Sequence, residues 1–284
     1  MEAASLEIFA RATAAENDPR PMPPALLFLA HPDDETIALG GRLGRFRDTH
    51  LIHVTDGAPH NEDFARAHRL NSVAEYRRVR WEELRHALDL AGIADISREC
   101  LEVADQEASF QLTWLTRRLL LLLRIHQPQA VFTHPFEGGH PDHDACAFAA
   151  NHAVALLRFR HEPAPILIEA PFYHAGQFGE GMETGNFLPD AGDTATIVYP
   201  LSVQEQRRKR ALLGCFATQN TMLSSFTVAE ERFRIAPAYE FRRPANFGAV
   251  FYDNYSWGIN SRGFRDLAWE AEDALEEEMK AACC

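Results

Sequence analysis

The sequence predicts an α/β protein with a mainly parallel sheet and helices on both faces. Short continuous apolar runs, typical of strands buried on both faces, alternate with amphipathic segments long enough for helices. This alternation favours βαβ units. Two segments rich in histidine and carboxylate side chains directly follow two of the apolar runs. Because such sheets bind ligands at the carboxyl ends of their strands, we expect the active site there.

The N-terminal elements follow this pattern in order. Residues 1–18 are expected to contain a short helix, and the proline-rich residues 19–24 form a stiff, extended lead-in. The run ALLFLA at 25–30 is bounded by turn-prone and charged residues, which indicates a buried strand. Residues 36–46 then have helical spacing, and residues 51–55 form a second strand that Asp-Gly ends.

The middle of the chain continues the alternation. Residues 72–91 place their apolar side chains on one face of a long helix. Residues 100–103 are the third expected strand and residues 112–125 the next helix, which Pro128 closes before a fourth strand at 130–133. The remaining expected elements are a helix over 142–160 and strands over 166–168 and 196–198.

The chain is expected to fold as a single domain over residues 25–265. Residues 1–24 are an N-terminal extension, and residues 266–284 are an acidic helix and tail. Within that tail, residues 270–284 hold six acids and one lysine, which gives 1 − 6 = −5 of the total charge of −13.

Composition narrows the function classes. The 284 residues are 46% hydrophobic and 24% charged, as in a globular protein with a sizeable core. A net charge of −13 argues against nucleic acid or an anionic membrane as the main partner. Neither a signal peptide nor an apolar run of the roughly 18 residues that span a membrane is visible. We therefore expect a cytoplasmic protein, and its five cysteines, which form no CxxC pair, predict no disulfide framework.

The chemistry-bearing residues lie after the first and fourth expected strands. His31, Asp33 and Asp34 belong to the segment AHPDDE, and the segment HPDHD begins at His140. Histidines and carboxylates three residues apart share one side of a first helical turn. Convergent His and Asp ligands suit Zn²⁺, Fe²⁺ or Co²⁺. Asp33 then fits a general base, His140 an acid or carbonyl-polarising group, and Asp142 a group that orients a neighbouring imidazole.

Either segment alone has a simpler interpretation. Acidic residues after a strand are usually favoured at a helix N-terminus by the helix dipole. An isolated HPDH is more often the start of a surface helix. Helix starts need no histidines, however, and here histidines occupy both junctions. The two segments together therefore favour a metal site.

The pair AHPDDE and HPDH resembles the signature of the PIG-L (LmbE-like) family of zinc-dependent de-N-acetylases. Thr55-Asp56-Gly57 and Arg80-x-x-Glu83 also resemble motifs of that family. The resemblance implies a Rossmann-like fold and hydrolysis of an N-acetyl group from an N-acetylglucosamine-type sugar or conjugate. It implies the following roles: His31, Asp34 and His143 as zinc ligands, Asp33 as base, His140 as acid or oxyanion donor, and Asp142 as support. Gly138-Gly139 stands where many relatives carry a polar residue, so their substrate contacts do not transfer.

Other residues allow two interpretations each. Arg80 either reaches the sugar or pairs with Glu82 or Glu83 on a helix surface. Glu137 either meets a sugar hydroxyl or is a solvated loop acid. His134 either lines the site or packs beneath it. The long loop over residues 172–193 is either a substrate-facing lid or ordinary surface, and the basic run at 204–210 is expected on a solvated helix face.

Three functions are therefore consistent with the sequence. The leading hypothesis is a zinc-dependent N-deacetylase acting on a small N-acetylated sugar. The second is a zinc amidase for another amide, such as a thiol conjugate. The third is a metal-binding protein without turnover, which the presence of both Asp33 and His140 argues against. The sugar, the aglycone, the native metal and any homo-oligomer are left open by the sequence.

Overall fold

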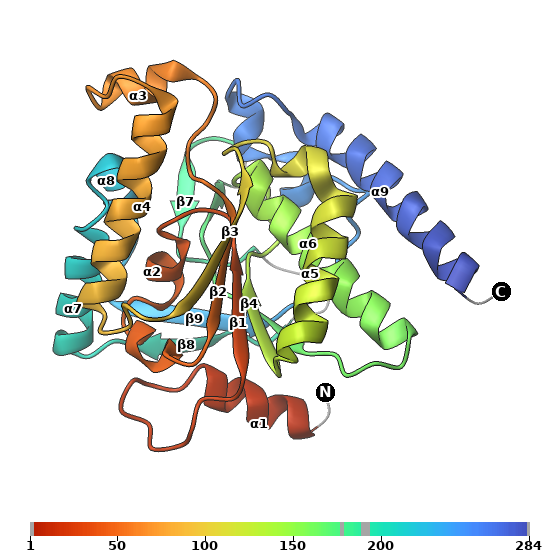
Figure 1. The fold of residues 1–284 in the computed structure, drawn as a ribbon, viewed down its shortest axis with the longest axis horizontal. Coiled ribbons are helices and arrows are strands. Elements are labelled where there is room, and N and C mark those ends of the chain that lie inside the picture. The colour runs from red at the N-terminus through yellow and green to blue at the C-terminus, as the bar shows by residue number, and fades with distance from the viewer. Residues whose placement is uncertain (1–2, 177–178, 189–193, 283–284) are drawn as a thin grey trace.

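A seven-stranded sheet forms the centre of the protein, as the computed structural model shows for residues 3–176, 179–188 and 194–282 (Figure 1). Its strand order is β3-β2-β1-β4-β5-β9-β8. The first five of these strands are parallel, whereas β9 pairs antiparallel with both β5 and β8. The strands are β1 (Ala25–Leu29), β2 (His50–Thr55), β3 (Ser97–Val103), β4 (Ala130–Thr133), β5 (Ile166–Glu169), β8 (Ile197–Pro200) and β9 (Glu230–Ile235). A separate hairpin consists of β6 (Tyr173–Ala175) and β7 (Met182–Thr184).

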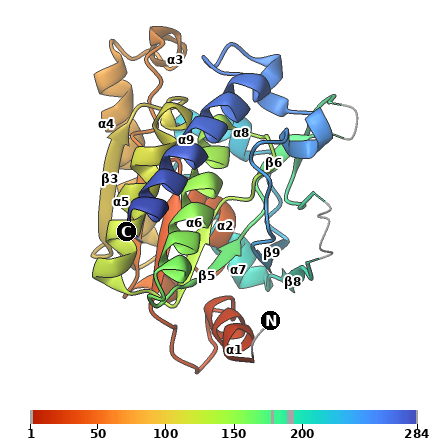
Figure 2. The same cartoon turned by 90° about the vertical axis from the view of Figure 1, so that its right-hand side faces the viewer.

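Helices cover both faces of this sheet, as the sequence predicts (Figures 1 and 2). One face carries α5 (Leu112–His126), α6 (Pro141–Phe159) and α9 (Ser261–Ala282). The other carries α2 (Asp34–Leu39), α4 (Val73–Leu90) and α7 (Val203–Leu213). The remaining helices are α1 (Ala3–Ala12), α3 (Glu62–Ala67) and α8 (Asn220–Leu223).

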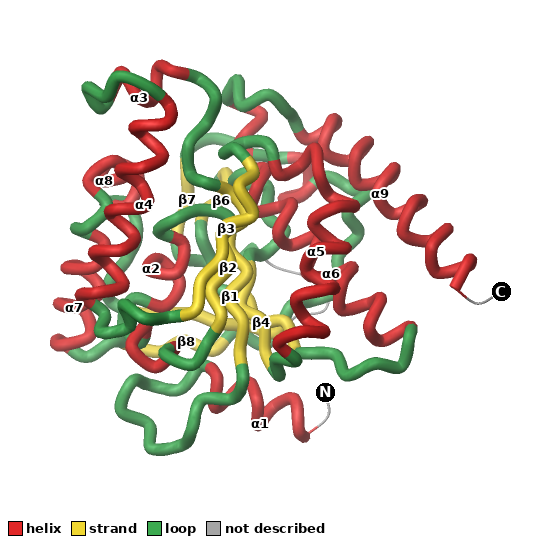
Figure 3. The backbone as a smooth tube through the Cα atoms, in the orientation of Figure 1, coloured by secondary structure: helices red, strands yellow, loops and turns green. Residues whose placement is uncertain are grey.

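Alternation along each strand divides the interior into two cores. In β1, Leu26 and Phe28 pack with α5, α6 and α9, whereas Leu27 and Leu29 pack with α2, α4 and α7. Successive side chains of a strand point to opposite faces, so a wholly apolar strand such as β1 requires cover on both sides. The tube in Figure 3 shows the strands enclosed in this way. The uninterrupted apolar run of β1 thus explains the layered architecture.

The hairpin β6–β7 and the short helices α3 and α8 were not expected, and two elements of the main sheet and its helices also differ from the expectation. The helix expected over 36–46 ends at Leu39, and a 3-10 helix at Leu43–Phe46 follows, because Gly40 and Gly41 weaken the helix between them. Strand β9 is absent from the prediction, because its sequence EERFRI is more charged than that of a buried strand. Its charges are paired: the carboxylate of Glu231, for example, contacts Arg42 and Lys209.

Helix α9 begins at Ser261, five residues before the acidic helix and tail expected over 266–284, and is only partly exposed. Ala268, Ala271 and Leu275 are buried in the core that α9 shares with α5 and α6. Its acids lie on its outer side, where Arg117 pairs with Glu278. No helix within the described part of the chain has the length and apolar character needed to cross a membrane.

The basic run over 204–210 is not wholly solvated, because Lys209 of α7 is 2% exposed. Its ammonium lies 3.1 Å from Glu231, which also accepts a 2.6 Å hydrogen bond from Arg42. Glu231→Ala would leave both cations without this buried partner, so we expect the free energy of unfolding to fall by about 3–5 kcal/mol. Urea denaturation measures this. The neighbouring variant Glu230→Ala, at a half-buried pair with Arg232, should cost less than about 1 kcal/mol; equal losses would contradict the prediction.

Candidate metal centre

The sheet topology brings the two sequence motifs together. Strand β1 lies between β2 and β4, so connections from the centre of the sheet leave in opposite directions at this point. The first motif follows β1 and the second follows β4. Such a switch point opens a crevice at the carboxyl ends of the strands. The residues that the sequence places at two strand ends therefore face one another.

The first motif is held by a tight helix start. Asp34 is the first residue of α2, and its carboxylate accepts a 2.7 Å hydrogen bond from the backbone N–H of His31. Asp33 adopts φ 148°, a conformation that residues other than glycine rarely adopt. Backbone strain of this kind is concentrated at functional sites. The Asp33 carboxylate contacts Arg80, whereas that of Asp34 lies beside His31 and His143.

The second motif forms the start of α6. His140 is the N-cap, and its ring Nδ1 accepts a 3.2 Å hydrogen bond from the backbone N–H of Asp142. Pro141 occupies the first turn, where the missing N–H costs nothing. Gly139 precedes the cap because a Cβ there would lie 1.9 Å from the Tyr173 carbonyl oxygen. Gly139 therefore allows the loop to approach β6 closely.

Three expected ligands have the spacing that one ion requires. His31 Nδ1 lies 3.2 Å from His143 Nε2 and 3.6 Å from Asp34 Oδ2, and His143 Nε2 lies 3.5 Å from Asp34 Oδ1. Ligands about 2.0–2.2 Å from a tetrahedral ion are about 3.3–3.6 Å apart. All three residues are buried. The donor set thus fits Zn²⁺, and Fe²⁺ or Co²⁺ accept the same ligands.

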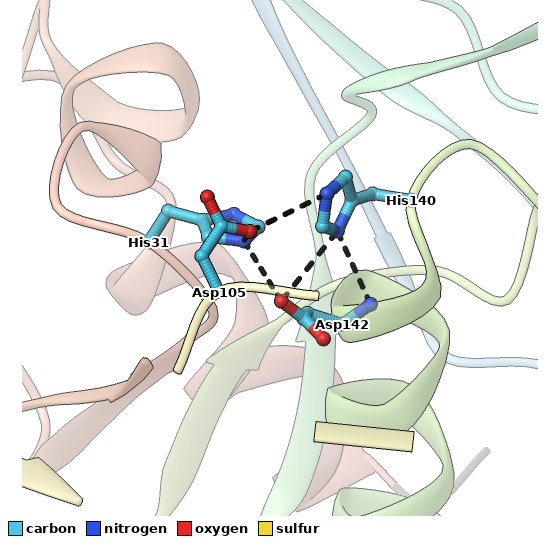
Figure 4. A group of neighbouring side chains, drawn as sticks. All are labelled: His31, Asp105, His140 and Asp142. Atoms are coloured by element: carbon cyan, nitrogen blue, oxygen red, sulfur yellow. Dashed lines mark hydrogen bonds and ion pairs between the residues drawn. The ribbon is translucent and has the colours of Figure 1, made fainter. Parts of the chain in front are cut away.

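A second group of side chains faces the opposite ring nitrogen of His31 (Figure 4). His31 Nε2 lies 3.2 Å from both Asp142 Oδ2 and Asp105 Oδ1. Histidines that bind metals commonly donate their other ring nitrogen to a carboxylate. Burial lowers the pKa of His31, but Asp105, Asp142 and Asp34 outweigh it and hold that pKa well above its usual range. Three carboxylates surrounding one imidazole favour a bound cation in the crevice.

His140 presents a hydrogen-bond donor to the crevice. Because its Nδ1 accepts the Asp142 N–H, the neutral ring must carry its proton on Nε2. Burial and the neighbouring His31 hold the pKa of His140 well below its usual range, so the neutral ring predominates. Its Nε2 lies 3.6 Å from Asp105. The ring can therefore donate to an oxygen that becomes negatively charged.

Arg80 binds the Asp33 carboxylate rather than a surface acid. Its Nη2 donates to Asp33 Oδ2 at 3.2 Å and to the Pro32 carbonyl at 2.8 Å, and its side chain is 3% exposed. The alternative of a surface pair with Glu82 or Glu83 is therefore wrong: Arg78 pairs with Glu82, and Glu83 accepts from Thr218. Burial raises the pKa of Asp33 to about 8 against the opposing effect of Arg80.

A cavity of about 230 Å³ connects these groups, and Arg80 lies in its wall. Its polar lining includes the three expected ligands, Asp33 and His140. Apolar side chains of Ile37, Leu223 and Phe226 form another part of the wall. The cavity therefore offers a polar, charged side and an apolar side to one ligand.

Asp142, which contacts His31, and two further candidates lie outside the lining of this cavity. Glu137 is buried, so a solvated loop acid is wrong, and its carboxylate accepts a 2.7 Å hydrogen bond from the Leu188 N–H. His134 packs beneath the site, stacked 4.0 Å from His143, with its Nε2 accepting from the Ala30 N–H. Both therefore hold neighbouring backbone, and His134 Nε2 also lies 3.2 Å from Oδ2 of the expected ligand Asp34.

Because the Glu137 carboxyl is buried, we expect the free energy of unfolding to depend on pH. Burial raises its pKa to about 8 despite Arg234, with Glu169 and Asp144 contributing in the same direction. The folded protein thus keeps this proton up to about pH 8, whereas the unfolded chain loses it near the ordinary value of 4.5. The free energy of unfolding should fall as pH rises between these values. Urea denaturation across this range should show a smaller fall for Glu137→Gln; an unchanged slope would contradict the assignment.

Asp105 is the residue that sequence reasoning missed. It lies just beyond the end of β3, contacts His31 and His140, and lines the cavity. Like the two motifs, Asp105 is a carboxylate that follows the carboxyl end of a parallel strand. The same rule could therefore have identified it from the sequence. Part of the 172–193 loop is also close: Phe172 and Tyr173 contact the ring of His143. Residues 177–178 and 189–193 of that loop lie outside the described residues.

These features define an α/β protein with a candidate metal centre at the switch point of its sheet. Residues 26–154 match the model of the PIG-L family, described as GlcNAc-PI de-N-acetylase. The chain therefore contains a PIG-L domain, and the resemblance predicted from its motifs is confirmed. No curated protein matches the chain.

Solved structures share the fold at low sequence identity. A zinc-inhibited form of teicoplanin deacetylase is 13% identical, covers 76% of this chain and 99% of its own, and has a TM-score of 0.55. N,N'-diacetylchitobiose deacetylase from Pyrococcus horikoshii is 20% identical (84% and 94% covered, TM-score 0.50). The 4-carboxy-2-hydroxymuconate hydratase from Pseudomonas putida KT2440 is 17% identical (77% and 98% covered, TM-score 0.51). The same architecture thus carries different reactions, and function must be argued from the site.

Proposed function

We propose that this protein is a metal-dependent N-deacetylase that hydrolyses the acetamide of an N-acetylglucosamine-type sugar or conjugate. The observation that carries the proposal is the position of Asp33 and His140 on the cavity that contains the three-ligand set. A protein that only binds metal needs neither. The PIG-L domain and the deacetylases among the structural neighbours support the same reaction.

His31, Asp34 and His143 would hold the ion, with Zn²⁺ as the first choice and Fe²⁺ or Co²⁺ as alternatives. A divalent ion bound by three protein ligands lowers the pKa of water and polarises a carbonyl. The carboxylates of Asp142 and Asp105 hold the ring of His31 in the orientation that this role requires.

The chain's own groups supply the proton transfers. Asp33, held by Arg80, removes a proton from the attacking water in its ionised form, which the positive charge of a bound ion would favour over the neutral form. His140 donates its Nε2–H toward the carbonyl oxygen as negative charge develops there. A new carbon–oxygen bond forms, the carbon–nitrogen bond breaks, and the proton on Asp33 passes to the departing amine. The products are acetate and the free amino sugar.

The apolar part of the cavity wall suits the acetyl methyl group. Ile37, Leu223 and Phe226 line the cavity and belong to one apolar cluster, beside which a charged group would not be favoured. A larger acyl group would have to displace these side chains. The proposal therefore favours acetyl over longer amides, which separates it from the amidase hypothesis.

The test is acetate release from N-acetylglucosamine and its conjugates by protein loaded with Zn²⁺, Fe²⁺ or Co²⁺. Acetate is expected with the loaded protein, and its release should stop after chelation and resume when the metal is restored. N-hexanoyl analogues should react at least about tenfold more slowly, since overpacking a filled wall is unfavourable. Faster release of the larger acid would favour a different amidase, and metal binding without any hydrolysis would favour a binding protein.

A further inference from the structure

A second, larger cavity opens from the candidate metal centre toward the surface. Its volume is about 830 Å³, compared with about 230 Å³ for the cavity at the metal ligands. Both cavities are lined by Phe64, Asp105, Gln219, Met222 and Trp257. Since they share these walls, a ligand at the metal centre can extend directly into the outer cavity.

The difference between the two cavity volumes indicates that each cavity binds a different part of the substrate. Pockets that bury most of a drug-sized ligand have volumes of about 300–1,000 Å³. The inner cavity lies below this range and the outer cavity lies within it. The inner one therefore accommodates the reacting acetamide and its sugar, whereas the outer one accommodates a substituent larger than the sugar.

Aromatic rings form one wall of the outer cavity. The rings of Tyr255 and Trp257 are stacked 4.7 Å apart at an interplanar angle of 13°, and Phe251 lies 5.0 Å from Tyr255. Trp257 also lies 4.8 Å from the ring of His140. The wall thus leads from the proposed oxyanion donor to Tyr255, which is 47% exposed. Such a surface favours a flat or apolar group.

The negative charge of the outer cavity argues against an anionic substituent on the sugar. Its described lining contains the carboxylates of Asp105 and Glu180 and includes neither lysine nor arginine. A phosphate or carboxylate placed there would meet these two carboxylates, and His68 is the one described lining side chain that can carry a positive charge. An uncharged group meets no such penalty.

We propose that the outer cavity binds the aglycone of the substrate and that this aglycone is bulky, apolar or aromatic, and not anionic. The inference rests on the proposed function for the identity of the sugar. It adds the chemical class of the group that the sugar carries, and it assigns Tyr255 and Glu180 to the selection of that group.

Three ligands test the inference: N-acetylglucosamine, its phenyl β-glycoside, and N-acetylglucosamine phosphorylated on its anomeric oxygen. With metal-loaded protein, kcat/KM for acetate release should be about tenfold higher for the phenyl glycoside than for the free sugar. The phosphorylated sugar should be the poorest of the three. Equal values for all three, or a preference for the phosphorylated sugar, would overturn the inference.

Two substitutions locate the preference in the outer cavity. Tyr255→Ala should reduce the ratio of the phenyl-glycoside kcat/KM to that of the free sugar at least about threefold. Its control is Trp114→Ala, because Trp114 is an aromatic residue of α5 that is 43% exposed and lines neither cavity.

Glu180→Lys should raise kcat/KM for the phosphorylated sugar several-fold. Glu277→Lys, an equal charge change on the exposed side of α9, should not. If kcat/KM for these sugars changed equally in a variant and in its control, the assignment of that residue to the outer cavity would be contradicted.

Equilibrium binding separates this inference from the proposed reaction. Calorimetry with the metal-loaded Asp33→Asn protein should give the same order of affinity: phenyl glycoside, free sugar, phosphorylated sugar. If this order is found but no ligand releases acetate with the wild-type protein, the proposed function fails and the cavity assignment stands. If acetate is released but the three ligands bind equally, or if none binds, the cavity assignment fails.

Discussion

Asp33→Asn is expected to lower kcat for acetate release at least about 100-fold while the protein still binds its metal. General-base catalysis typically contributes about 10²- to 10⁴-fold, and an amide in place of the carboxylate cannot take up the proton. Asparagine retains an oxygen that can accept the 3.2 Å hydrogen bond from Arg80. The buried guanidinium therefore keeps a partner, and the fold should be preserved. Single-turnover acetate measurements together with elemental analysis of the same sample give both quantities.

The control for this variant is Asp95→Asn, which makes the same chemical change at an exposed residue after α4. Its kcat should equal that of the wild-type protein. If Asp33→Asn retained a near-normal rate at saturating metal, the proton would have to pass through another group and the base assignment would be wrong. If the variant lost its metal instead, Asp33 would belong to the ligand set.

The expected ligands could be predicted because both motifs are local. His31 and Asp34 lie within one helix start after β1, and His140 and His143 lie within another after β4. Each pair needs only the geometry of a first helical turn to converge. The remaining step, that the two strands are adjacent, follows from the strand order of a doubly wound sheet.

The roles of Arg80 and Glu137 could not be predicted because they depend on contacts that are distant in the sequence. Arg80 belongs to an amphipathic helix, and only the packing of α4 shows that it contacts Asp33, 47 residues earlier. Burial of Glu137 depends on Leu188, 51 residues later. Charged residues at such positions look like surface residues in a sequence, since unpaired charges are rarely buried.

The fold was predictable where apolar periodicity was strong. Strand β1 and helix α5 follow the expected boundaries within one or two residues. Strand β9 was not predicted, because four of the six residues in its sequence EERFRI are charged. Glu231 pairs with Arg42 and Lys209, and Arg234 pairs with Glu169, all of them outside this strand. The antiparallel edge of the sheet is thus held by ion pairs that no local pattern reveals.

His143→Ala is expected to reduce metal affinity by more than about 100-fold. Residues that only support a ligand change affinity by about 10- to 100-fold, so loss of a ligand itself should cost more. Elemental analysis after dialysis against metal-free buffer should find less than about one-tenth of the wild-type metal content. Added Zn²⁺ should raise the Tm of the wild-type protein but not that of the variant, because an ion stabilises only the folded state that binds it.

A pair of histidine variants decides which group of side chains holds the ion. His143 belongs to the group with His31 and Asp34, whereas His140 belongs to the group with His31, Asp105 and Asp142. If the first group is the site, His143→Ala loses the metal and His140→Ala keeps it but loses turnover. The reverse result would place the ion between Asp105 and Asp142 and leave His143 a supporting residue. His152→Ala, a histidine farther along the same helix that pairs with Glu272, should keep both metal and activity.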